Sequence, residues 1–183
     1  VLGDSKKGDT RIRSLRDVVQ KLQRDGVRTV HVLREGDEVE IVREPLATDR
    51  RDLMGPFDII GDVHGCAAEL ETLLEKLGYG VIWHDEAGVR GVTIAPPPGR
   101  RLIFVGDLVD RGPRTPDVLR IVMSAAAAGH GFCVPGNHDA KFLRWLQGRN
   151  VKPTHGLDAT IAQMSDEPRD FHETIPLFQN VPN

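Results

Sequence analysis

The chain has 183 residues, which is enough for one domain with its own hydrophobic core and no need of disulfide bonds. Its 24 lysine and arginine residues against 27 aspartate and glutamate residues give a net charge of -3, which excludes a strongly basic nucleic-acid coat. The two cysteines, Cys66 and Cys133, lie far apart without a partner cluster, which argues against a disulfide framework and favours the cytoplasm. No apolar run approaches the roughly 20 residues of a membrane-spanning helix, so we expect no membrane partner.

The first 56 residues show short elements followed by a charged loop. Apolar residues at Leu15, Val18, Val19 and Leu22 follow a helical period and predict an amphipathic helix over residues 14–24. Residues 28–33 and 39–42 predict two short strands joined by a turn. Residues 45–56 contain prolines, a glycine and several charges, and they predict a boundary between two modules. We expect the first module to comprise residues 1–55 and the second residues 56–183.

From residue 57 onward, short apolar runs alternate with helical patterns. Strands are predicted at residues 57–60, 102–105 and 132–134, and helices around residues 70–77, 115–129 and 140–147. This alternation predicts an α/β fold with parallel strands. Residues 83–98, which include three consecutive prolines, are predicted to be an insertion before the second strand, and residues 179–183 are expected to form no finishing helix.

Each predicted strand is followed by residues of the types that bind divalent metal ions. The first strand leads to Asp62 and His64, the second to Asp107, and the third to Asn137 and His138. Ligands of open α/β sheets bind beyond the carboxyl ends of the strands, so these side chains are expected to share one site. Carboxylate, imidazole and amide groups suit manganese, iron or zinc, whereas a structural zinc site would favour a thiolate cluster. The pattern therefore predicts a two-metal hydrolytic site.

Each motif taken alone also has a purely structural explanation. An isolated Asp-x-His-Gly is usually a loop with a capping aspartate, and Asn-His-Asp is an ordinary turn. Gly-Asp and Arg-Gly pairs are typical of turns with a surface ion pair. Asp139 is interpreted as a cap of the following helix and not as a site residue. Three such motifs in succession, each after an apolar strand, nevertheless favour the metal site.

Three motifs carry a family resemblance: Asp62-x-His64, Gly106-Asp107-x-x-Asp110-Arg111-Gly112 and Gly136-Asn137-His138-Asp139. Together they resemble the calcineurin-like binuclear metallophosphoesterases, especially the branch of protein serine/threonine phosphatases and diadenosine tetraphosphatases. Residues 55–66, 134–139 and 154–157 further resemble the central phosphatase domain of bacterial polynucleotide kinase-phosphatase, and residues 28–52 resemble the end of its kinase module. The resemblance implies a calcineurin-like α/β sheet with flanking helices, of which residues 56–183 hold the first half, preceded by a small α/β segment in residues 1–55.

The resemblance also implies a role for each motif residue. It implies two divalent metal ions, manganese first with nickel, iron or zinc as alternatives. The implied metal ligands are Asp62, His64, Asp107 and Asn137, with Asp107 bridging the two ions. Arg111 is expected to clamp the phosphate oxygens of the substrate. His138 is expected to bind and protonate the leaving oxygen, with Asp110 orienting its imidazole.

The sequence departs from the family pattern in one respect. The family uses two further histidines from the later half of the domain, and neither of the elements that supply them occurs here. His155, in a Thr-His-Gly-Leu sequence, is kept as a site candidate, whereas the histidines at positions 31, 84, 130 and 172 are interpreted as surface or hydrogen-bonded residues. We therefore expect the isolated chain to be a weak or inactive phosphatase.

The main functional expectation is RNA repair, by removal of a 2′-, 3′- or 2′,3′-cyclic phosphate from RNA ends. The expected partners are RNA ends or another phosphoester substrate, and the kinase and ligase-like modules of a longer chain. One alternative is a stand-alone serine/threonine protein phosphatase or diadenosine tetraphosphatase. Another is an inactive truncated fragment that binds metal or RNA ends. No P-loop of the Gly-x-x-x-x-Gly-Lys-Ser/Thr type occurs, which excludes kinase activity for this chain.

Overall fold

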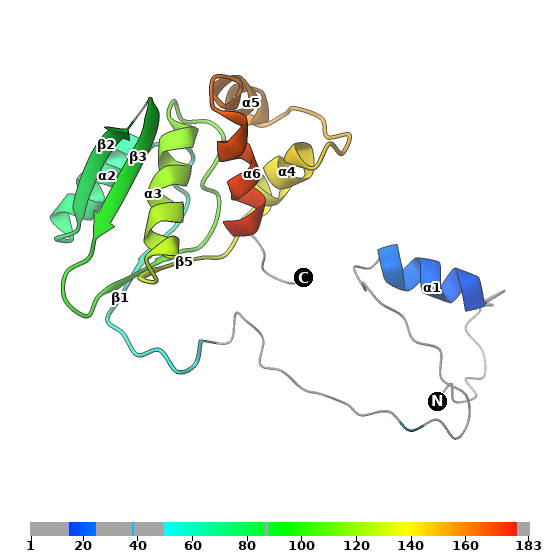
Figure 1. The fold of residues 1–183 in the computed structure, drawn as a ribbon, viewed down its shortest axis with the longest axis horizontal. Coiled ribbons are helices and arrows are strands. Elements are labelled where there is room, and N and C mark those ends of the chain that lie inside the picture. The colour runs from blue at the N-terminus through cyan, green and yellow to red at the C-terminus, as the bar shows by residue number, and fades with distance from the viewer. Residues whose placement is uncertain (1–14, 25–37, 39–49, 87, 179–183) are drawn as a thin grey trace. The chain divides into compact units, whose positions relative to one another are not determined.

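The computed structural model describes residues 15–24, 38, 50–86 and 88–178 (Figure 1). The chain divides into two compact units, Val1–Leu46 and Ala47–Pro182. In the first unit the structure describes helix α1 (Leu15–Arg24), which confirms the helix predicted there. The strands predicted at residues 28–33 and 39–42 lie outside the described residues.

The second unit contains a three-stranded parallel sheet. Strands β1 (Phe57–Ile60), β4 (Arg101–Phe104) and β5 (Gly131–Cys133) lie in the order β1-β4-β5. Ile60 pairs with Phe104, and Phe104 pairs with Cys133, so the three strands end at the same level. This confirms the predicted parallel α/β arrangement, and it brings the three loops that follow the strands to one edge of the sheet.

Three predicted helices occur, as α2 (Ala67–Lys76), α3 (Thr115–Ala127) and α4 (Asn137–Leu146). Helix α3 contacts β5 and also strand β3 (Val89–Ala95) (Figure 1). Most residues of α3 are buried. Helix α4 begins three residues earlier than predicted, because the Asp139 carboxylate caps its first turn. No helix in the described part of the chain is both long and apolar enough to cross a membrane.

Two parts of the second unit differ from the sequence-based expectations. The segment predicted to be an insertion forms an antiparallel hairpin of β2 (Gly80–Glu86) and β3 (Val89–Ala95), with Val92 and Ile94 buried. The chain also continues beyond α4 as α5 (Leu157–Ser165) and α6 (Arg169–Phe178), which the sequence patterns did not predict. Residues 179–183, where no finishing helix is expected, lie outside the described residues. Leu157, Met164 and Ile175 of these helices are fully buried, and this burial stabilises both helices.

One face of the parallel sheet carries exposed apolar side chains. Ile59 in β1 is 68% exposed, and Val105 and Val134, which directly follow β4 and β5, are 51% and 56% exposed. Ile59 pairs with Ile103, and side chains alternate along a strand, so Ile59 and Val105 project from the same face. The opposite face holds the fully buried Leu102 and Phe104, so the core lies on one side of the sheet.

Candidate metal centre

The loops after β1 and β4 are hydrogen-bonded to each other. The backbone N–H of His64 donates to the carbonyl oxygen of Asp107 over 2.8 Å, and the N–H of Gly65 donates to that of Leu108 over 2.8 Å. A Cβ atom at Gly65 would lie only 2.8 Å from Oγ1 of Thr115, so glycine is required at this crossing. The two loops therefore hold the candidate ligands on one rigid support.

Several candidate site residues have a left-handed backbone conformation. Their φ angles are 46° at Asp62 and His64, 52° at Asp107, 72° at Asp110 and 69° at Arg111. Such angles strain any residue other than glycine by roughly 1–3 kcal/mol, and residues strained in this way cluster at functional sites. Hydrogen bonds hold the side chains of His64, Asp107 and Asp110 despite the strain.

Three side chains from the three loops form a group that fits a metal ion. One ligand atom each from His64, Asp107 and His138 lie within 4.8 Å of one another. His64 Nδ1 lies 2.9 Å from the carbonyl oxygen of Val109. Because a carbonyl oxygen can only accept, Nδ1 carries the proton, and the Nε2 lone pair is available for a metal ion. One carboxylate and two imidazoles are donors that suit divalent transition metals.

His138 connects this group to two further predicted residues. Its Nδ1 donates to Oδ2 of Asp110 over 2.7 Å, and its Nε2 lies 3.4 Å from a guanidinium nitrogen of Arg111. Its ring also meets the His64 ring edge-on, with centroids 4.9 Å apart. The structure therefore brings together His64, Asp107, Asp110, Arg111 and His138, as the sequence pattern indicated.

Asp139 is fully buried, and its carboxylate accepts hydrogen bonds from backbone N–H groups of two of the loops. Its Oδ2 accepts the N–H of Gly136 over 2.8 Å, which confirms its interpretation as a helix cap. Its Oδ1 also accepts the N–H groups of Leu108 and Val109, over 3.0 and 3.3 Å. Burial raises the pKa of the Asp139 carboxyl, and the backbone hydrogen bonds oppose this shift. This carboxylate thus joins the loop after β4 to the start of α4.

The remaining two predicted ligands lie at the same edge. Asp62 is exposed on the loop after β1 and lies outside the three-residue ligand group of the described chain. Asn137 is the first residue of α4, and the next backbone N–H, that of His138, donates to Oδ1 of Asp107 over 3.2 Å. The site candidate His155 is exposed on the loop before α5, with φ 63°, and its Nδ1 contacts Oγ1 of Thr154.

Sequence reasoning missed two polar residues that contact the candidate site. Thr160 and Gln163 of α5 are hydrogen-bonded to the segment that runs from Asp110 to Thr115. Their signal in the sequence is weak, because threonine and glutamine are common on helix surfaces and carry no metal-binding pattern. They would have been found only if α5 had been predicted and its buried face identified.

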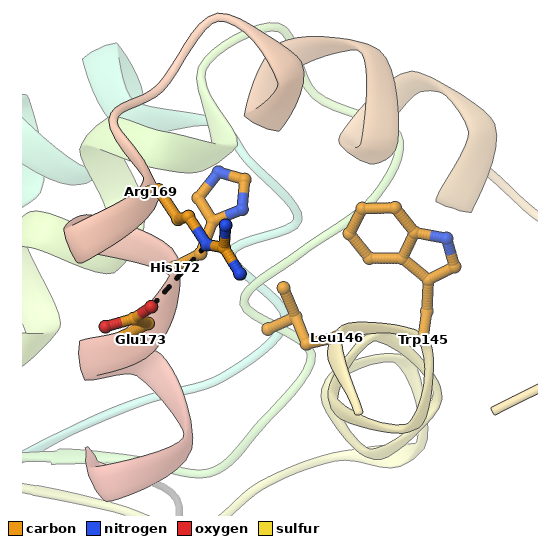
Figure 2. Close-up of a pocket in the computed structure, with 5 residues that line it drawn as sticks. All are labelled: Trp145, Leu146, Arg169, His172 and Glu173. Atoms are coloured by element: carbon orange, nitrogen blue, oxygen red, sulfur yellow. Dashed lines mark ion pairs between the residues drawn. The ribbon is translucent and has the colours of Figure 1, made fainter. Parts of the chain in front are cut away.

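A hollow of about 510 Å³ lies away from the strand ends, between α4 and α6 (Figure 2). Its walls are formed by Trp145, Leu146, Arg169, His172 and Glu173. Trp145 lies about 10 Å along the helix axis from His138, at the opposite end of α4. His172 donates through Nε2 to the carbonyl oxygen of Met164 over 2.8 Å, which confirms its interpretation as a hydrogen-bonded histidine.

The sequence of the second unit matches one known family over most of its length. Residues 55–181 match the calcineurin-like phosphoesterases. The chain belongs to this family. The match spans the strands and the three loops of the candidate centre, and it confirms the expected calcineurin-like sheet with flanking helices. Calcineurin-like phosphoesterases use divalent metal ions, and the group of His64, Asp107 and His138 offers ligand atoms for one.

Several relatives of this calcineurin-like chain are named for the same activity. The bis(5'-nucleosyl)-tetraphosphatase PrpE (asymmetrical) of Anoxybacillus flavithermus is 41% identical over 131 residues, which cover 69% of this chain and 50% of that protein. PrpE of Bacillus subtilis is 39% identical over 142 residues, which cover 69% and 53%. A crystal structure of a candidate diadenosine tetraphosphatase is 27% identical, with a TM-score of 0.43, over 66% of this chain and 41% of that one. The chain spans about half the length of the curated relatives it matches.

These relatives correct the expected function of this phosphoesterase. Repair of RNA ends, as in bacterial polynucleotide kinase-phosphatase, is wrong as the main reading, because relatives at 41% and 39% identity are named bis(5'-nucleosyl)-tetraphosphatases. They favour the alternative of a diadenosine tetraphosphatase. The error has a physical reason: the motifs indicate metal and phosphate chemistry, which phosphoesterases with many different substrates share, and they carry no information about the part of a substrate that distinguishes RNA from a dinucleotide.

Proposed function

We propose that this protein hydrolyses bis(5'-nucleosyl) tetraphosphates in a metal-dependent reaction that cleaves the phosphate chain asymmetrically. The observation that carries the proposal is the gathering of His64, Asp107 and His138, whose ligand atoms lie within 4.8 Å of one another beside Arg111. The substrate class comes from the PrpE relatives, which are 41% and 39% identical to this chain.

The metal ions are proposed to bind at the carboxyl edge of the sheet, with manganese as the first ion to test. The proposed ligands are Asp62, His64, Asp107 and Asn137. His64 offers its Nε2 lone pair, because its Nδ1 proton is held by Val109. Asp107 is oriented by the N–H of His138, which donates to its Oδ1. Divalent ions bound there supply Lewis-acid activation of water and of the phosphate oxygens.

Arg111 and His138 are proposed to act on the substrate directly. The Arg111 side chain is exposed beside His138, so its guanidinium is placed to bind the oxygens of an incoming phosphate. His138 is not one of the four proposed metal ligands, because its Nε2 is proposed instead to deliver a proton to the leaving phosphate oxygen. Asp110 accepts a hydrogen bond from Nδ1 of the same ring, which fixes the ring so that Nε2 is the nitrogen that faces the substrate.

The direction of cleavage can be read from the products. A chain of four phosphates divides symmetrically into two nucleoside diphosphates, and asymmetrically into one monophosphate and one triphosphate. We expect diadenosine tetraphosphate and Mn²⁺, incubated with the whole protein, to give AMP and ATP in equal amounts on anion-exchange chromatography, whereas these 183 residues alone are expected to be weak or inactive. The Asp107→Asn variant, which has the same shape without the charge, serves as the control and is expected to be inactive. ADP as the main product, or equal turnover by the variant, would contradict the proposal.

A further inference from the structure

Helix α5 lies directly against the loop that carries Asp110 and Arg111. Gly156, the residue before the helix, has no room for a side chain, because a Cβ atom would lie 2.7 Å from the backbone nitrogen of Arg111. Thr160 and Gln163 lie one helical turn apart and therefore on the same face of α5. That face contacts the loop at both of these residues.

Thr160 holds Asp110 through two hydrogen bonds. Its hydroxyl donates to Oδ1 of Asp110 over 2.7 Å, and its oxygen accepts the backbone N–H of Asp110 over 3.0 Å. Both residues are fully buried. Oδ2 of Asp110 accepts a hydrogen bond from Nδ1 of His138, so both carboxylate oxygens are hydrogen-bonded. The carboxylate is therefore held in one orientation. Thr160, Asp110 and His138 thus form a continuous buried chain of hydrogen bonds that ends at the candidate centre.

Gln163 holds the far side of the same loop. Its Nε2 donates to the carbonyl oxygen of Gly112 over 2.9 Å, and its Oε1 accepts the N–H of Thr115 over 2.7 Å. Thr115 is the first residue of α3, so Gln163 joins the loop to the start of the central helix. The strained backbone at Asp110 and Arg111 is therefore held from both sides by α5.

We propose that Thr160 is a positioning residue for the phosphoesterase reaction, and that it acts by fixing the Asp110 carboxylate that orients His138. The catalytic part of this inference rests on the proposed function, because it takes His138 as the proton donor. Loss of such supporting hydrogen bonds around a reactive centre typically lowers activity by about 10- to 100-fold. We expect a loss of that size in kcat, with little change in KM, when the hydroxyl of Thr160 is removed.

The catalytic test compares three variants. Thr160→Val keeps the side-chain shape without the hydroxyl, and Thr160→Ser keeps the hydroxyl. Thr72→Val is the matched control, because the Thr72 hydroxyl also donates a hydrogen bond, to the carbonyl oxygen of Ala68, on an exposed part of α2. We expect Thr160→Val alone to lower kcat, by more for phenyl phosphate, a poor leaving group, than for p-nitrophenyl phosphate, which needs less protonation.

A second measurement does not depend on activity. NMR of the imidazole nitrogens reports whether the Nδ1 proton of His138 is held or exchanges with water. We expect a held proton in the wild type, Thr160→Ser and Thr72→Val, and an exchanging proton in Thr160→Val, with all four proteins folded by circular dichroism. An Nδ1 proton that stays held in Thr160→Val would overturn the inference. Inactivity of the whole protein on every substrate would instead refute the proposed function, and the NMR result would still decide the position of Asp110.

Discussion

His138 Nδ1 lies 2.7 Å from Oδ2 of Asp110, and both side chains are buried, His138 at 7% exposure and Asp110 at 0%. A carboxylate has only acceptor oxygens, so the Nδ1 nitrogen of the ring is the donor in this pair. The opposite ring nitrogen, Nε2, therefore faces Arg111 and the ligand group. This pair determines which nitrogen of His138 can contact a substrate. Substitution of Asp110 is therefore the most direct test of the pair.

Replacing Asp110 with asparagine is expected to lower kcat by about 10²- to 10⁴-fold, because an amide can donate to Nδ1 and select the wrong tautomer of His138. The metal content, measured by elemental analysis, is expected to stay near that of the wild type, since Asp110 is not a proposed ligand. Steady-state hydrolysis of diadenosine tetraphosphate with Mn²⁺ measures the rate. A variant that keeps the wild-type kcat would show that the pair has a structural role only.

Replacing Arg111 with alanine is expected to lower kcat/KM by about 10²- to 10³-fold, which corresponds to roughly 3–4 kcal/mol of lost transition-state stabilisation. The reason is that the guanidinium lies beside His138 and offers a fork of donors to phosphate oxygens. Arg144→Ala, on the exposed part of α4, is the matched control and is expected to keep its activity. Equal rates for the two variants would remove Arg111 from the proposed reaction.

Binding of Mn²⁺ is expected to raise the temperature of thermal unfolding, because an ion that binds only the folded protein stabilises it by about 2.7 kcal/mol at 100 times its dissociation constant. The His64→Ala variant loses a proposed ligand, so its unfolding temperature is expected to respond less. His130→Ala, a histidine outside the ligand group of the described residues, is the control. Scanning calorimetry with and without a chelator measures the difference, and an equal response by both variants would contradict the assignment of His64.

Asp58 is expected to make the stability depend on pH in the acid range. The hydrogen bond from Arg100, aided by that from Tyr79, holds the pKa of this nearly buried carboxyl below its ordinary 3.8. A carboxyl with a lowered folded-state pKa contributes stability above pH 3.8 that is lost as the pH falls through the folded value. Asp58→Asn is therefore expected to be less stable at neutral pH, by about 1–3 kcal/mol, and to lose less stability on acidification.

Urea unfolding followed by circular dichroism between pH 7 and pH 2.5 measures this difference. Asp166→Asn is the matched control, because Asp166 is an exposed aspartate at the end of α5. Its stability is expected to follow that of the wild type at every pH. If Asp58→Asn does so as well, the contacts of Asp58 with Arg100 and Tyr79 do not stabilise the fold.

The parallel sheet and its site edge could be predicted from the sequence because the apolar runs are short and each is followed by metal-binding residue types. Ile60, Phe104 and Cys133 end their strands at the same level, so linear order along the chain translates into proximity in space. The hairpin of β2 and β3 was missed because it alternates weakly and is flanked by consecutive prolines. Its stability comes from tertiary contact with α3, which no local pattern reports.

Helices α5 and α6 were missed for different local reasons. The residue before α5 is Gly156, in a left-handed conformation with φ 99° and no capping side chain, so the usual start signal is absent from this helix. Helix α6 includes a proline at position 176, a residue that more often marks a helix end. The substrate could not be predicted because Asp107, Asn137 and His138 belong to motifs whose proposed roles concern the metal and the phosphate, and such motifs carry no information about the rest of a substrate.

The left-handed backbone at Asp62, His64, Asp107, Asp110 and Arg111 has an evolutionary consequence. Glycine adopts these angles without strain, so at each of the five positions a change to glycine relieves local strain while it deletes a side chain that is proposed to take part in the reaction. Selection for stability and selection for chemistry therefore oppose each other at these sites. In a lineage that has lost the reaction, we expect glycine or asparagine to accumulate at these positions while the buried core stays unchanged. The residue types at the five positions would then indicate whether a related chain has kept the activity.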